Sequence, residues 1–152
     1  MKNEKLTLGF GVPEHGWLTV KIAYNDFRLQ FDASDVPENP IDQLVATLRS
    51  VIKGINTEVW WHLEPEGYYF EFEKISDKYR FRISFANSSN SDRKKHFELD
   101  GDFKELILPI YRAILKFIDQ PHEQQNWPQT DRLETEKLIR LVKEIKTTQN
   151  KV

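Results

Sequence analysis

The chain contains no cysteine among its 152 residues. This absence excludes disulfide bonds, zinc sites built on thiolates, and thiol nucleophiles. It is compatible with a reducing compartment, and we expect a cytoplasmic protein. Apolar runs of the roughly 18 residues that a membrane-spanning helix needs are also missing. The N-terminus, MKNEKLTLGFGV, lacks the uninterrupted apolar stretch of a signal peptide, so we expect no membrane partner.

An excess of either charge is missing as well. Lysine and arginine number 22 against 24 aspartates and glutamates, for a net charge of -2. Nucleic-acid binders usually carry a basic excess or a basic stripe. The densest basic cluster, Arg93-Lys94-Lys95-His96, adjoins a stretch rich in serine and asparagine, and no aromatic platform flanks it. We interpret this cluster as a solvated loop and expect no nucleic-acid partner.

Motifs for catalysis or metal binding are not evident. The histidines at positions 15, 62, 96 and 122 do not have the spacing of a helical metal motif. Neither a Gly-x-Ser-x-Gly elbow nor a phosphate loop is present. Glu71 and Glu73 share a strand face as glycosidase carboxylates can, but each has an arginine as its expected partner. The sequence predicts no catalytic residue, no metal and no cofactor.

Length and composition indicate one domain spanning residues 1–152. Hydrophobic residues make up 39% of the chain and charged residues 30%, which is ordinary for a globular domain. Alternating apolar residues predict a β-hairpin over residues 17–34, on both sides of Asn25-Asp26. The register that joins the apolar sides sets Ile22 opposite Leu29. LTLGF, residues 6–10, is compatible with an earlier strand.

A helix is predicted to follow the hairpin, within DVPENPIDQLVATLRSVIKG. Asn39 is placed to cap it, and Pro40 suits its first position. Apolar residues then recur at helical spacing on one stripe, and Gly54 ends the helix.

Residues 57–87 are predicted to form three further strands. A tight turn at Ser76-Asp77 sets Phe72 opposite Phe81. The same register places acids beside arginines at two points: Glu73 beside Arg80, and Glu71 beside Arg82. Because the apolar and the charged patterns agree, we expect this register to be correct.

Two more helices are expected after a polar loop at residues 86–95 and a short strand in HFEL. Asp102 and Glu105 form a capping box for a strongly apolar helix. Pro109 either kinks that helix or marks its start. Asp131 opens the last, amphipathic helix. The element order predicts an α+β fold, with one antiparallel sheet packed on one face by three helices.

WWHLEPEGYYFEFEK, residues 60–74, contains adjacent tryptophans, which on a strand point to opposite faces. A two-residue loop within Glu64-Pro65-Glu66-Gly67 would pair Trp61 with Phe70 and gather the large apolar groups on one face. A bulge in the same turn would shift the pairing by one residue and turn Trp60 inward. The first register buries more apolar surface, and it is the one that we expect.

In that register an aromatic and charged face points outward. Tryptophan, tyrosine and arginine are enriched at the energetic centres of protein–protein interfaces. We therefore predict a docking surface for a protein partner, or for a second copy in a homodimer. Its predicted residues are Trp60, His62, Tyr69, Glu71, Arg80 and Arg82. The alternative is that helices or loops cover this face, or that its rings pack on neighbouring arginines.

The stretch ASDVPENPIDQLVATLRSVIKG…EVWWHLEPEGYYFEFE resembles a group of small bacterial proteins that are uncharacterised or immunity-like. These proteins combine a hairpin, a helix opened by an x-Pro step, and a strand ending in Glu-Pro before an aromatic strand. The resemblance covers residues 17–85. Because several such proteins are encoded near toxins, it implies a cytoplasmic, non-catalytic protein that binds a partner, with toxin neutralisation as its most specific form. A small-molecule-binding protein or an enzyme that uses the exposed sheet face or a sheet–helix cleft remains the alternative.

Overall fold

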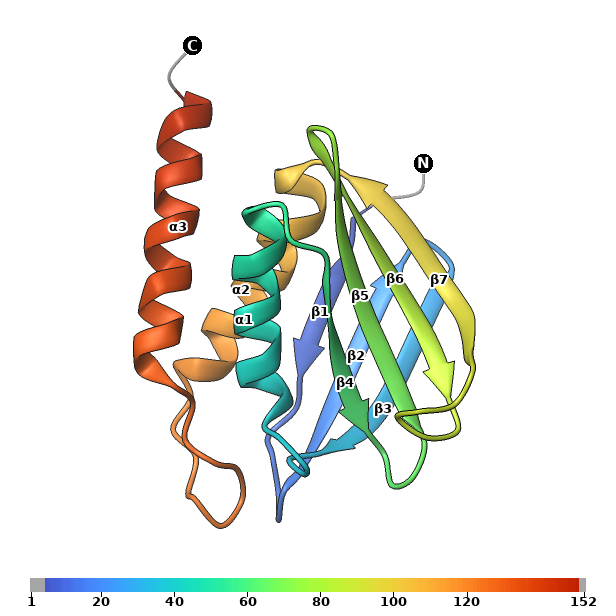
Figure 1. Ribbon diagram of the computed structural model, residues 1–152. Helices are drawn as coiled ribbons and strands as arrows, with labels where there is room; N and C mark the ends of the chain where they lie inside the picture. The colour runs from blue at the N-terminus through green and yellow to red at the C-terminus, as the bar shows by residue number, and fades with distance from the viewer. Residues whose placement is uncertain (1–4, 151–152) are drawn as a thin grey trace.

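The computed structural model describes residues 5–150, which form two antiparallel sheets and three α-helices (Figure 1). The first sheet has the strand order β1 (Thr7–Phe10), β2 (Trp17–Tyr24) and β3 (Phe27–Ser34). The second has the order β4 (Thr57–His62), β5 (Gly67–Ile75), β6 (Lys78–Ala86) and β7 (Arg93–Gly101). The helices are α1 (Pro40–Ile52), α2 (Leu108–Ile118) and α3 (Arg132–Asn150), and a π-helical turn, η1 (Phe103–Ile107), precedes α2. The α+β class is confirmed.

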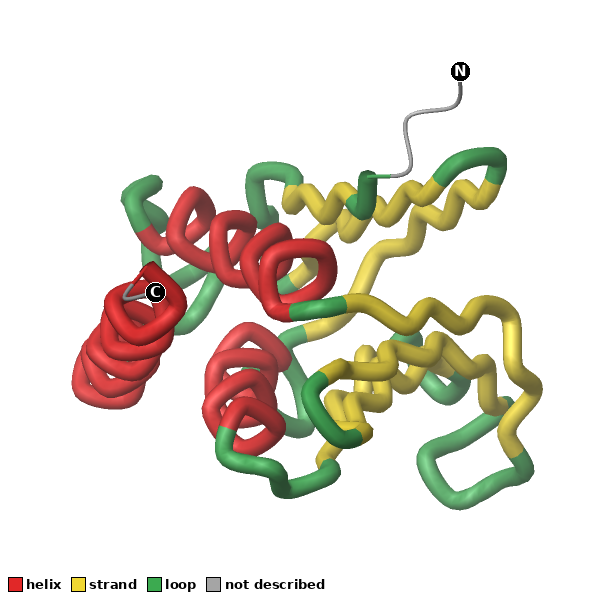
Figure 2. The backbone as a smooth tube through the Cα atoms, turned by 90° about the horizontal axis from the view of Figure 1, so that it is seen from above, coloured by secondary structure: helices red, strands yellow, loops and turns green. Residues whose placement is uncertain are grey.

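The strands are divided between two sheets instead of forming the single sheet that we expected. The sheets lie as two layers with the helices along one side (Figure 2). Aromatic rings fill the space between the layers: Phe31 of β3 lies 6.0 Å from Trp61 of β4, and Phe27 stacks on Phe97 of β7 at 4.4 Å between ring centroids. Because both sheets carry large apolar side chains on one face, stacking the two faces hides both from water.

The predicted hairpin is confirmed in its register. Ile22 pairs with Leu29, and a two-residue turn joins Tyr24 to Phe27. Asn25 adopts a φ of 52°, in the left-handed region that such short hairpin turns require. The strand expected within residues 6–10 is β1, which pairs with β2.

The predicted helix boundaries are also confirmed. The Asn39 side chain accepts a hydrogen bond from the Ile41 amide at 3.0 Å, and Gly54 follows the helix with a φ of 90°. The capping box is formed, since Asp102 accepts from the Glu105 amide at 2.8 Å and the Glu105 carboxylate accepts from the Asp102 amide at 2.9 Å. The regular helix α2 begins at Leu108, directly after the π-helical turn η1, and its proline lies in the first turn.

The last helix begins after Asp131, as expected. The Asp131 carboxylate accepts a hydrogen bond from the Glu134 amide at 3.2 Å. Leu138 and Val142 are fully buried, whereas Leu141 is half-buried. Within residues 5–150, none of the helices combines the length and apolarity needed to cross a bilayer.

Strand β7 is longer than the predicted strand in HFEL. It begins at Arg93, so the basic cluster lies on a strand and not in the loop to which we assigned it. The first part of the strand was missed because residues 93–96 are polar on both faces and show no apolar alternation. Pairing with β6 nevertheless satisfies the hydrogen-bonding groups of its backbone. The pairing shifts by one residue along the way: Ile83 pairs with Phe97, but Ser84 pairs with Lys95.

The pairing of β4 with β5 differs from the one we expected, whereas the assignment of faces is confirmed. Trp61 pairs with Tyr68, two positions away from Phe70. The reason is the loop, which has four residues, 63–66, and contains a cis Glu64–Pro65 peptide bond and a 2.7 Å hydrogen bond from the Leu63 amide to the Glu66 carbonyl. A shift of two residues leaves every side chain on the same face. Trp61 is accordingly 0% exposed in the core, and Trp60 lies on the outer side, half-buried.

Candidate functional site

The candidate site is the outer face of the second sheet, the side of β4–β7 that points away from the first sheet. In the part of the chain that the structure describes, no helix crosses this face, which is turned toward the viewer in Figure 1. All six residues of the predicted docking surface lie on it: Trp60, His62, Tyr69, Glu71, Arg80 and Arg82. Strand pairing brings them together in rows, with Trp60 beside Tyr69 and Glu71 beside Arg82.

Trp60, His62 and Tyr69 form an aromatic corner at one end of the outer face. The rings of Trp60 and Tyr69 lie 4.6 Å apart between centroids, inclined by 45°. The indole Nε1 of Trp60 donates a hydrogen bond to His62 Nδ1 at 3.1 Å. Gly67 makes room for this arrangement, because a Cβ there would collide with the Trp61 carbonyl and lie 2.6 Å from the Trp60 ring. The corner is therefore fixed by its neighbours before any partner arrives.

Tyr69 points outward as expected, but the protein itself covers it. The ring is only 5% exposed, with the Arg93 guanidinium carbon 3.5 Å from its centroid. Its hydroxyl donates to the carbonyl oxygen of Ser89, in the loop of residues 87–92 that crosses in front of β5 in Figure 1. Tyr69 is therefore covered by an arginine and a loop, which was the alternative to an open docking surface. Trp60 and His62 remain partly exposed to solvent.

The remainder of the outer face is an ion-pair lattice of three arginines, one lysine and five carboxylates. Its members are Arg80, Arg82, Arg93, Lys95, Glu58, Glu71, Glu73, Glu98 and Asp100. Arg82 bridges two strands, with Glu71 at 3.2 Å on one side and Glu98 at 2.7 Å on the other. The guanidinium groups are thus oriented by carboxylates in adjacent strands, and the lattice presents fixed charges rather than mobile ones.

One expected ion pair has a different partner. Arg80 is opposite Glu73 in the strand register, but its guanidinium donates two hydrogen bonds to Asp100, at 2.7 and 3.0 Å. Glu73 instead lies 3.5 Å from Arg82. Asp100 was not expected as the partner because it lies just beyond the strand predicted in HFEL, whereas β7 continues to Gly101.

Electrostatics keep the lattice charged. The hydrogen bond from Arg82 lowers the pKa of Glu98, and the hydrogen bond from Arg80 lowers the pKa of Asp100. The same hydrogen bonds raise the pKa of both arginines. A face of this kind favours recognition by fixed charge and shape over proton transfer, because general acid–base catalysis needs groups that change their protonation state near neutral pH.

Arg93 is the main residue that the sequence analysis missed. Its guanidinium makes two hydrogen bonds to Glu58, at 2.7 and 2.8 Å, and lies 3.5 Å from Glu71. The hydrogen bonds to Glu58 raise the pKa of Arg93. Arg93 therefore ties the start of β7 to β4 across the outer face. Regular alternation from the inward Phe97 would have put Arg93 on the inner face, and the one-residue shift between Ile83 and Ser84 turns it outward.

A second feature bears on the alternative function, a cleft between the sheet and the helices. It has a volume of about 550 Å³ and lies between the tip of the β5–β6 hairpin, η1 and the end of α3. Tyr79 and Phe103 form part of its floor, and Lys74 and Lys104 stand at its rim. Among residues 5–150, no three His, Asp or Glu side chains are grouped so that they could hold a metal ion.

No family model, curated protein or solved structure compared with the chain matches it. The geometry defines an α+β protein in which no helix of residues 5–150 crosses one sheet face, and this face carries an aromatic corner beside a lattice of fixed charges.

Proposed function

We propose that the chain is a non-catalytic protein-binding domain and that the outer face of β4–β7 is its docking surface. The observation that carries this proposal is the position of Trp60, a partly exposed ring held by its neighbours on a sheet face that no described helix crosses. Such side chains dominate binding energy in protein interfaces. Because their conformations are already fixed, little rotamer freedom would be lost on binding.

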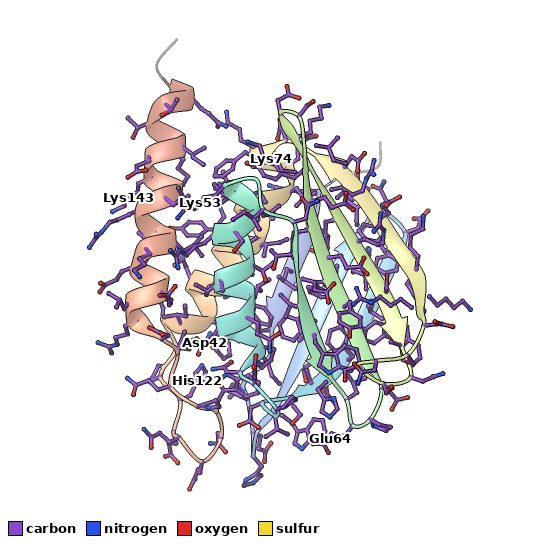
Figure 3. All side chains as sticks on the ribbon, in the orientation of Figure 1. Asp42, Lys53, Glu64, Lys74, His122 and Lys143 are labelled. Carbon is purple, nitrogen blue, oxygen red and sulfur yellow. The ribbon has the colours of Figure 1, made fainter. Side chains whose placement is uncertain are left out.

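The charge of the lattice indicates the chemistry of the partner. Its five carboxylates exceed its four cations by one, and Glu64 and Glu66 extend the acidic character to the tip of the β4–β5 hairpin, where Figure 3 labels Glu64. Complementary potentials raise association rates and suppress wrong partners. We expect the partner to present a basic contact surface, with an apolar or aromatic group opposite Trp60.

The most specific form of this proposal is an immunity protein that neutralises a bacterial toxin in the cytoplasm. It is supported by the resemblance over residues 17–85 and by the acidic excess of the docking surface. The direct test is co-expression with a toxin encoded beside the gene, scored by cell survival. Survival that does not depend on the outer face, for example with Trp60→Ala equal to wild type, would argue against this form.

Partner capture from the native cytoplasm, followed by affinity measurement with the purified partner, tests the general proposal. Trp60→Ala should weaken binding by about 30-fold, the effect of losing about 2 kcal/mol at an interface centre. Lys21→Ala is the control, since Lys21 is exposed on β2 of the other sheet. Equal affinity of Trp60→Ala and wild type, with both folded by circular dichroism, would remove the outer face as the docking surface.

The cleft supports a second candidate function, the binding of a small molecule. Its volume of about 550 Å³ falls in the usual range of ligand pockets, and its floor is aromatic with lysines at the rim. A ligand screen read by NMR tests it. Shifts confined to residues 74–79 and 102–104 would favour this function over docking through the outer face.

A further inference from the structure

A second charged surface lies in the groove between α1 and α3, away from the outer sheet face. A hollow of about 220 Å³ is present there, with Leu141 and Glu144 among its lining residues. Its other lining residues are all cationic: Arg49, Lys53, Lys137 and Arg140. The cationic residues come from both helices and line this small volume from two sides.

The two helices are held side by side by contacts beneath the hollow. Leu138 and Val142 of α3 are buried, and Arg49 of α1 forms an ion pair with Glu134 of α3. Lys137 lies 3.3 Å from the same carboxylate. Glu134 thus partly neutralises one end of the hollow and fixes the spacing of the helices there.

At the other end of the hollow, Glu144 is the one carboxylate among the lining residues, and it forms no ion pair with a described cation. Within residues 5–150, neither Lys53 nor Arg140 makes an ion pair. Figure 3 shows Lys53 at the C-terminal end of α1, on the side of α3. The helix dipole favours a cation at that end and so accounts for Lys53 alone. It does not account for Arg140, which lies in the middle of α3. Bringing these like charges together costs free energy that a bound anion would recover.

We propose that this hollow binds a phosphate group, either free or as part of a small phosphorylated molecule. Arginine forks and lysine ammonium groups are the usual ligands of phosphate oxygens, and both kinds converge here. The hollow is small enough to favour a compact anion. Glu144 at its edge opposes a broad acidic protein surface, which would have to pass close to this carboxylate. The site is independent of the docking surface on β4–β7.

The test is a titration of the full chain with inorganic phosphate, pyrophosphate and ADP at low ionic strength, followed by amide NMR and thermal unfolding. Saturable shifts at Lys53 and residues 137–144, with a rise in Tm, are expected. The double variant Lys53→Gln/Arg140→Gln should bind pyrophosphate at least about tenfold more weakly. In the absence of phosphate its Tm should equal or exceed that of wild type, because the repulsion is relieved.

Lys116→Gln is the matched control. Lys116 is exposed in the last turn of α2, so it shares the helix-end position of Lys53 but lies outside the hollow. Its phosphate affinity should equal that of wild type. Tighter binding of ADP than of pyrophosphate would identify a nucleotide as the source of the phosphate group, and equal binding would identify the phosphate alone.

Three results would overturn the proposal. The first is a Kd weaker than about 10 mM for all three probes. The second is equal binding by the double variant and wild type. The third is tighter binding of a polyglutamate peptide than of pyrophosphate, which would assign the groove to an acidic protein segment.

Discussion

The indole of Trp60 and the imidazole of His62 are joined by a hydrogen bond in which Nε1 of the tryptophan donates to Nδ1 of the histidine, 3.1 Å away. The two residues lie on the same side of β4, separated by one position, and the bond orients the ring that we place at the centre of the docking surface. This pair makes the conformation of Trp60 dependent on the His62 side chain, which supplies the acceptor for the indole N–H.

His62→Ala should release the Trp60 ring. The change removes the imidazole nitrogen that accepts the hydrogen bond from the Trp60 indole. The indole N–H resonance of Trp60 should therefore lie upfield of its wild-type position, in a ¹H–¹⁵N spectrum. The same position in both proteins would show that the bond does not form in solution.

Gly67→Ala should be strongly destabilising. The added methyl group would collide with the carbonyl oxygen of Trp61 and the ring of Trp60, so either β4 or the aromatic corner must move. We expect a loss of about 3 kcal/mol in the free energy of unfolding, measured with urea. Gly9→Ala is the matched control, because nothing lies within 4 Å of its Cβ position. Its effect should be about 0.5 kcal/mol or less. Equal effects at the two positions would mean that Trp60 does not lie over Gly67.

The interaction of Arg80 with Asp100 should stabilise the protein in a pH-dependent way. The hydrogen bond from Arg80 lowers the pKa of Asp100 in the folded state, so its contribution is present above the ordinary value of 3.8 and is lost as the pH falls through the lower folded value. Arg80→Gln should therefore be less stable than wild type at pH 7, and the difference should shrink toward pH 2. Urea denaturation at several pH values measures both. A difference that stays constant with pH would exclude Asp100 as the partner.

Arg93→Ala should destabilise the protein and uncover Tyr69. The change removes the cation over the tyrosine ring and both hydrogen bonds to Glu58. We expect a loss of about 1–3 kcal/mol in unfolding free energy. Arg93→Lys keeps the charge but not the two-pronged geometry, so it should recover part of this loss. Full recovery by lysine would show that charge alone matters at this position.

The parts of the fold that follow from local patterns could be predicted from the sequence. Alternation on both sides of Asn25-Asp26 and of Ser76-Asp77 fixes two hairpins and their registers, because in each case a short turn leaves one way to join the apolar sides. The cap at Asn39 and the glycine at position 54 likewise fix the ends of α1.

Other features depend on geometry that no short pattern contains. Apolar alternation determines that Trp61 is buried and Trp60 is not, but it cannot distinguish pairings that differ by two residues. The length of the loop determines which of these pairings forms. We expected a two-residue loop, whereas the loop has four residues and a cis Glu64–Pro65 bond. The stacking of two sheets, and the folding of residues 87–92 over Tyr69, depend on contacts between distant segments.

The one-residue shift in the pairing of β6 with β7 has a consequence for the other side of β7, which is the free edge of its sheet. Regular strand addition by another chain needs a straight, evenly spaced ladder of amides and carbonyls. The extra residue at His96 interrupts that ladder, and Lys94 and Asp100 place charges near its two ends. The edge is thus a poor template for fibre growth. The outer face of β4–β7 can therefore stay accessible to a partner while other copies of the chain do not add along β7.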